Sequence, residues 1–81
     1  MSKYSVNYQT GAGNFTKIAD LDKVMAAAVE GIGFTQESVI ITDEDSKEVA
    51  RLPWYGCKAE VDDVVTVDYG DNGFYSEWII S

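Results

Sequence analysis

One segment of this 81-residue chain, from Asp20 to Gly33, has the spacing of an amphipathic helix. Asp20 is a good N-cap, because its carboxylate can accept a hydrogen bond from an amide of the first turn, and Gly31 or Gly33 is expected to end the helix in the left-handed conformation. Because no other segment has this period, the chain has one helix, which needs a sheet to bury its apolar face. The residues of that face are Leu21, Val24, Met25, Ala28 and Ile32.

The N-terminal segment has the pattern of a half-buried strand. Apolar residues alternate there with polar ones, and the glycine-containing stretch 10–14 then breaks the alternation. Phe15 and Ile18 follow, either as a short return strand or as an extended lead into the helix. The alternating apolar residues are Tyr4, Val6 and Tyr8.

Two hairpins are predicted after the helix. Val39–Thr42 is β-branched throughout, which favours a central strand, and it would pair with a second strand at Val49–Trp54. Val64–Tyr69 and Phe74–Ile80 would form the second hairpin, because an Asn-Gly pair between them favours a tight turn. Along the last strand, alternate residues would face opposite sides of the sheet.

The expected fold is therefore a single α+β domain at residues 1–81, with the order β-α-β-β-β-β. One helix packs on a mostly antiparallel sheet of four to five strands. The opposite face of the sheet would be at least partly exposed to water.

Negative charge is concentrated in the second half of the chain. The net charge is −8, of which residues 43–81 carry −7 and residues 1–42 carry −1. Acidic surfaces repel phosphate backbones and anionic lipid, so we expect no direct binding to nucleic acid or membranes. A basic protein partner fits this charge, and a homodimer formed through strand edges is an alternative.

The residue types needed for catalysis and for common metal sites are scarce. The chain has no histidine, so zinc has almost no ligands and Cys57 has no histidine to activate it. A turn beginning at Asp43 resembles the start of a calcium loop, but Glu48 replaces the glycine and Trp54 the closing glutamate. We therefore expect a non-catalytic protein without a metal or cofactor.

A lone cysteine cannot form an internal disulfide, which favours a reducing compartment. The N-terminus also lacks the apolar core of a signal peptide. The expected location is the cytoplasm.

The candidate partner-binding residues combine aromatic rings with carboxylates. Trp54 and Tyr55 stand where the chain leaves a predicted strand for a loop at 55–63, and Tyr75 lies in the last strand. Tyrosine and tryptophan are enriched at binding hot spots, although in a small sheet the same rings can simply form the core. The full candidate set is Trp54, Tyr55, Tyr75, Asp43, Glu44, Asp45, Asp62 and Asp63.

The layout of the chain resembles that of small uncharacterised proteins carried on bacterial phages and other mobile elements. The resemblance rests on Thr10-Gly11-Ala12-Gly13-Asn14, the helix, Gly33-Phe34-Thr35-Gln36 and the Val39–Arg51 hairpin. It implies an accessory protein that acts on a host protein.

Two further functions stay open beside a protein-binding module. One is an inhibitor that mimics nucleic acid, of the anti-CRISPR or anti-restriction type, which needs a row of carboxylates at about 7 Å spacing. The other is a structural homo-oligomer joined through strand edges.

Overall fold

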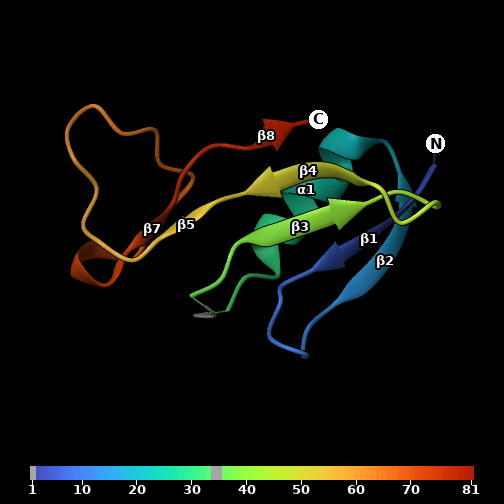
Figure 1. Ribbon diagram of the computed structural model, residues 1–81, viewed down its shortest axis with the longest axis horizontal. Coiled ribbons are helices and arrows are strands. Elements are labelled where there is room, and N and C mark those ends of the chain that lie inside the picture. The colour runs from blue at the N-terminus through green and yellow to red at the C-terminus, as the bar shows by residue number, and fades with distance from the viewer. Residues whose placement is uncertain (1, 34–35) are drawn as a thin grey trace.

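The helix α1 (Leu21–Glu30) packs against one face of a five-stranded antiparallel sheet in the computed structural model, which describes residues 2–33 and 36–81 (Figure 1). We call this the main sheet; its strand order is β2-β1-β3-β4-β8. The α+β fold expected from the sequence is confirmed. The strands are β1 (Ser2–Asn7), β2 (Phe15–Ala19), β3 (Val39–Thr42), β4 (Glu48–Leu52) and β8 (Ile79–Ile80).

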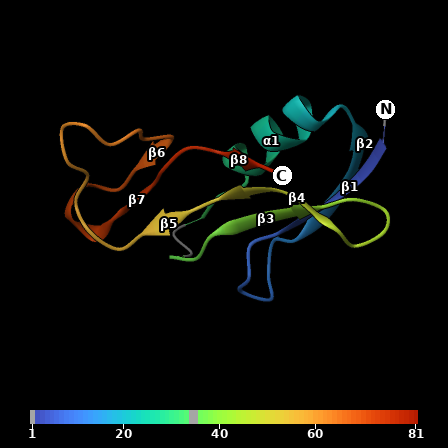
Figure 2. The same cartoon turned by 45° about the horizontal axis from the view of Figure 1, so that its top comes forward.

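A second sheet extends from one end of the main sheet (Figure 2). This small sheet has the order β5-β7-β6, and each of its strands is two residues long. Together the two sheets give a molecule of 36 × 25 × 18 Å. The strands of the small sheet are β5 (Trp54–Tyr55), β6 (Val67–Asp68) and β7 (Phe74–Tyr75), with a short 3-10 helix, η1 (Gly70–Asn72), before β7.

The predicted start of the helix is confirmed, but the predicted left-handed glycine at its end is wrong. Asp20 occupies the N-cap with extended backbone, although its side chain makes no capping hydrogen bond. The C-cap, Gly31, has φ −85° and is right-handed, and Gly33 also lies outside the positive-φ region.

Space, and not handedness, explains the glycine at 31. The Tyr8 hydroxyl donates a hydrogen bond of 2.7 Å to the Ala28 carbonyl, and a Cβ at residue 31 would lie 2.5 Å from that hydroxyl oxygen. A continuing helix would bond this carbonyl to the amide of Ile32, which instead donates to Val29. Tyr8 therefore satisfies a carbonyl at the end of α1, and Gly31 makes room for it.

The main sheet follows the alternation of its sequence. The return strand after residues 10–14 is present as β2, which pairs with β1, and β3 lies in the centre as predicted. Alternate residues of β3 and β4 are fully buried, and they pack with Val24 and Ala28 of α1 in one core. The opposite face carries Ile18, which is 68% exposed.

The hairpin β3–β4 closes through a turn that is held by Asp43. Its Oδ1 accepts hydrogen bonds from the amides of Asp45 and Lys47, at 2.8 and 3.0 Å. Beyond Leu52 the predicted second strand is interrupted at Pro53 and continues as β5 in the small sheet. Proline cannot donate to a strand ladder, which fits a change of sheet at this residue.

The second predicted hairpin is shorter than expected. Phe74–Ile80 is not one strand, because after β7 the amide of Ser76 donates to the Pro53 carbonyl and the chain crosses to pair β8 with β4. The predicted alternation of faces is therefore wrong: Phe74 and Tyr75 are both buried, whereas Ile79 and Ile80 are each 54% exposed.

The turn expected around the Asn-Gly pair contains a short 3-10 helix. Residues 70–72 form η1, and Gly73 has φ 137°. A Cβ at Gly73 would collide with the Tyr55 carbonyl and the Trp54 ring, so this position needs glycine for both conformation and space.

In the described part of the chain, no helix has the length and apolar character needed to cross a membrane.

Candidate functional site

The structure separates the two predicted acidic groups. Asp43, Glu44 and Asp45 lie in the β3–β4 turn, where Glu44 Oε1 accepts a 3.2 Å hydrogen bond from the Lys3 amide of β1. Asp62 and Asp63 lie in the loop that joins β5 to β6, at the other end of the long axis (Figure 1). The eight candidate residues therefore do not form one site.

Two of the three predicted aromatic residues belong to the interior. Tyr75 is fully buried, and its ring centroid lies 4.9 Å from that of Trp54 and 6.2 Å from that of Tyr69. Trp54 is half-buried against the core. Of these two partner-binding candidates, Tyr75 has no accessible surface for a partner to contact, whereas Trp54 is only partly exposed, because its ring packs beside that of Tyr75.

Tyr55 is the aromatic candidate that reaches the surface. Its side chain is 48% exposed, and its ring stacks on that of Phe74 with centroids 5.3 Å apart and an interplanar angle of 29°. Phe74 is only 3% exposed, so it forms a buried support for the tyrosine ring.

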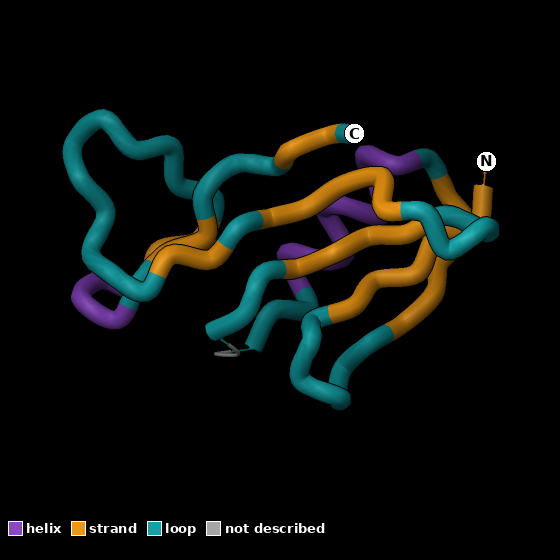
Figure 3. Tube along the Cα trace, viewed as in Figure 1, coloured by secondary structure: helices purple, strands orange, loops and turns teal. Residues whose placement is uncertain are grey.

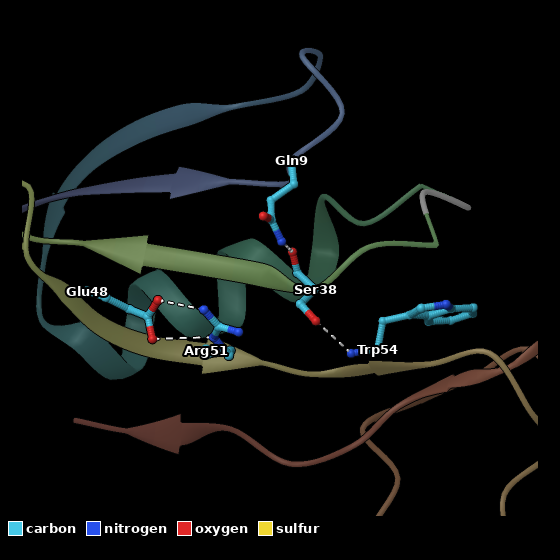
Figure 4. A network of polar contacts seen from close by, with 5 residues as sticks. All are labelled: Gln9, Ser38, Glu48, Arg51 and Trp54. Carbon is cyan, nitrogen blue, oxygen red and sulfur yellow. Dashed lines mark hydrogen bonds and ion pairs between the residues drawn. The ribbon is translucent and has the colours of Figure 1, made fainter.

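A network of hydrogen bonds fixes the backbone where β5 begins (Figure 4). The Trp54 amide donates to Ser38 Oγ at 3.0 Å, and the Ser38 carbonyl accepts from Gln9 Nε2 at 2.9 Å. On neighbouring β4, Arg51 and Glu48 form an ion pair at 3.0 Å, which raises the pKa of Arg51. Ser38, directly before β3, thus holds the residue before Tyr55 in place.

The loop at 56–66 contains neither helix nor strand and extends beyond the small sheet (Figure 3). It presents three apolar side chains to solvent: Val61 is 100% exposed, Val64 53% and Val65 37%. Internal hydrogen bonds nevertheless give it shape, since the Glu60 amide donates to Asp63 Oδ2 at 2.8 Å and the Asp63 amide donates to the Glu60 carbonyl at 3.1 Å. At its end, the Thr66 amide donates to the carbonyls of Tyr75 and Ser76. Loops of this kind often carry function.

Sequence reasoning missed these valines, because Val64 and Val65 were assigned to a strand and Val61 to an unremarked loop. The local pattern was misleading, because Val61, Val64 and Val65 have the i, i+3, i+4 spacing of a helix face and residues 64–67 are β-branched, yet residues 61–65 form neither helix nor strand.

A surface hollow lies beside Tyr55, and we call it the Tyr55 hollow. Its volume is about 490 Å³, and it brings the stacked rings together with two carboxylates, a lysine and the free, exposed thiol of Cys57. The lining residues are Tyr55, Cys57, Lys58, Glu60, Asp63, Phe74 and Ser76.

Strong negative charge surrounds this hollow. Residues 54–75 contain five carboxylates and one basic residue, Lys58, so they carry −4 of the chain's net −8. Burial, with a smaller contribution from the nearby Tyr75, raises the pKa of Tyr69. We call residues 54–75 the small-sheet end. This part of the molecule therefore presents both exposed apolar groups and negative charge.

Within residues 2–33 and 36–81, no group of three or more cysteine, aspartate or glutamate side chains is placed to hold a metal ion.

Comparison with known proteins finds no similarity to this chain: no family model, no curated protein and no solved structure matches it.

Proposed function

We propose that this chain is a small, non-catalytic protein-binding module that docks through the small-sheet end. The observation that carries this proposal is the exposure of Val61, Val64 and Val65 on a loop shaped by its own hydrogen bonds. A partner that covers these valines removes apolar surface from water, which is the dominant favourable contribution in most protein association.

Charge specifies the kind of partner. The net charge of −4 over residues 54–75 favours a partner with a basic surface, because complementary charge speeds encounter and rejects acidic competitors. Tyr55 adds a half-exposed aromatic ring that is already held in place, so little side-chain entropy is lost on binding. In line with the resemblance in layout, we take the module to be a phage or mobile-element accessory protein that acts on a host protein in the cytoplasm.

The positions of the acidic turns favour this function over mimicry of nucleic acid. A mimic needs one row of carboxylates, whereas Asp43–Asp45 and Asp62–Asp63 lie at opposite ends of the molecule (Figure 2). Contacts that combine apolar groups with charge are typical of protein interfaces.

The test compares two double variants as affinity baits. Val61→Ser with Val64→Ser removes apolar surface from the loop, and Ile18→Ser with Ile79→Ser removes similar groups from the main sheet. We expect the loop variant to lose partners that the wild type and the main-sheet variant both retain. Circular dichroism checks that both variants are folded. Equal recovery of the same partners by all three proteins would contradict docking through the loop.

Homo-oligomerisation is separated by measuring mass in solution. The main-sheet edges β2 and β8 carry exposed Ile18, Ile79 and Ile80. If light scattering finds a dimer that Ile18→Ser with Ile79→Ser dissociates, while partner binding is unaffected by the loop variant, the edge-paired oligomer replaces the docking module.

A further inference from the structure

We propose that the Tyr55 hollow binds an arginine side chain presented by a basic partner protein. The inference rests on the proposed function and specifies the chemistry of its central contact. Three features of the hollow carry it: an aromatic wall, two carboxylates, and the position of Lys58.

The aromatic wall offers a supported π face. Phe74, which is buried, lies under the Tyr55 ring, so the exposed part of that ring is the surface that a ligand meets. The Tyr55 backbone is fixed as well, because its carbonyl lies directly against Gly73 and it pairs with Phe74 across β5 and β7. A guanidinium stacks on a tyrosine ring through cation–π attraction and planar contact.

The carboxylates supply acceptors for the guanidinium. Glu60 and Asp63 line the same hollow as Tyr55. Asp63 Oδ2 accepts a hydrogen bond of 2.8 Å from the Glu60 amide, which orients this carboxylate. A planar group with five donors matches a ring beside two carboxylates better than a compact ammonium does, so arginine is favoured over lysine.

Lys58 is the one cation that lines the hollow, and it forms no ion pair with another described residue. Its positive charge lowers the net negative charge of the hollow and repels an incoming arginine. Removing the Lys58 charge should therefore strengthen binding, whereas a substitution that only disrupted the local structure would weaken it.

Size and openness fit a presented side chain. A volume of about 490 Å³ is ample for a guanidinium with its methylene stem, and it lies within the range of small-molecule sites of about 300–1,000 Å³. The exposed Val61 and Val64 are sequence neighbours of Glu60 and Asp63, which line the hollow, so one partner surface can present the arginine and also cover these valines.

The experiment is an NMR titration of the full chain at about 150 mM salt, where long-range charge effects are largely screened. The probes are two capped peptides in which glycine alternates with arginine or with lysine. We expect shift changes centred on Tyr55, residues 57–63 and Ser76, with the arginine peptide bound about threefold more tightly.

Variants identify the groups that make the contact. Tyr55→Leu keeps an apolar side chain and should weaken binding about fivefold, and Glu60→Gln should weaken it about threefold. Lys58→Ala should tighten binding about threefold. Asp62→Asn is the matched control: it removes the same charge as Glu60→Gln from a residue that does not line the hollow, so it should weaken binding clearly less than Glu60→Gln.

Diffuse shifts, or equal weakening by Asp62→Asn and Glu60→Gln, would show charge attraction without a site and would overturn the inference. Equal binding of both peptides would overturn the preference for arginine. If the titration fails while the loop variant, Val61→Ser with Val64→Ser, still loses its partner, the arginine site is wrong and the docking function stands. If the titration succeeds while the loop variant keeps its partner, the proposal of docking through the loop is wrong.

Discussion

The main sheet and the small sheet are both antiparallel, yet they bury their side chains by different means. In the main sheet, long strands alternate, so that Val39 and Ile41 of β3 and Leu52 of β4 face α1 and are fully buried. In the small sheet the strands are two residues long, and burial comes from aromatic rings. The ring centroid of Trp54 lies 4.9 Å from that of Tyr75 and 5.9 Å from that of Tyr69. Regular pairing organises the first region, and a ring cluster organises the second.

The two regions nevertheless share one core. Tyr75 of β7 belongs to the same cluster of buried residues as Val6 of β1 and Leu52 of β4. The chain also crosses between the sheets twice, at Pro53 and after Tyr75. We therefore expect the two sheets to unfold as one cooperative unit, and the following predictions test that expectation, from the largest effect to the smallest.

Leu52→Ala should produce the largest loss of stability. Leu52 is fully buried at the end of β4, and truncating a buried leucine costs about 3 kcal/mol of unfolding free energy through lost burial and the cavity left behind. Urea unfolding measures the loss. The control is the neighbouring Arg51→Ala, whose ion pair with Glu48 is exposed to solvent, so its loss should change stability far less. A loss below about 1 kcal/mol for Leu52→Ala would mean that the core relaxes around the site.

Gly73→Ala should follow, at about 2–3 kcal/mol, because the added Cβ meets the Tyr55 carbonyl and the Trp54 ring at a φ of 137°. Gly70→Ala is the matched control: its φ is also positive, at 67°, but a Cβ there meets no atom within 4 Å, so it should cost about 1 kcal/mol.

The same Gly73→Ala variant tests whether the two regions are coupled. Near-ultraviolet circular dichroism follows the ring cluster of the small sheet, and far-ultraviolet circular dichroism follows α1 and the main sheet. We expect both transitions to move together in urea. If only the near-ultraviolet transition moves, the small sheet unfolds independently and the shared core is too weak to couple it.

The same contrast explains what could be predicted from the sequence. The helix, β1 and the β3–β4 hairpin follow from local periodicity, since each buries alternate or helically spaced side chains against one neighbour. The small sheet depends on contacts across the chain, such as Trp54 with Tyr75 and the crossing after β7, and no spacing rule encodes these. Pattern reasoning therefore extended Phe74–Ile80 into one strand.

The candidate site divides in the same way. Tyr55 and Asp63 were predicted, because ring type and charge are visible in the sequence, and the structure places both at the Tyr55 hollow. That Asp43 lies at the other end of the molecule depends on where the strand ends meet, which residue type alone does not give. Tyr75 and Trp54 could not be told from Tyr55 by residue type, since burial is decided by which ring has Phe74 beneath it and which fills the core.

Tyr8→Phe should lower stability by about 1–2 kcal/mol. Its hydroxyl donates to the Ala28 carbonyl at the end of α1, and the substitution leaves this buried acceptor without that bond. Chemical unfolding of Tyr8→Phe against wild type gives the loss. The control is Tyr55→Phe, which removes a hydroxyl from a half-exposed ring and should be nearly neutral.

Tyr8 also gives a pH dependence. Burial, and then the nearby Tyr75, raise the pKa of Tyr8 above its ordinary value of 10.0, so the folded chain favours the neutral hydroxyl. Its contribution is therefore complete below pH 10.0 and is lost as the pH rises through the raised pKa. Unfolding free energies measured from about pH 9 to 11.5 should fall less steeply for Tyr8→Phe than for wild type. Parallel curves would show that other groups cause the alkaline loss.

Val61→Ser should have the smallest effect on stability, within about 0.5 kcal/mol of wild type, because a fully exposed side chain has no packing to lose. This prediction sharpens the contrast between the two regions. Leu52 of the main sheet stabilises the chain without reaching the surface, whereas Val61 would contribute to binding alone. Thermal unfolding and partner affinity, measured on the same variant, separate these roles. A destabilised Val61→Ser would mean that the loop packs on its own sheet in solution, and the valines would then be part of the small sheet's core instead of its docking surface.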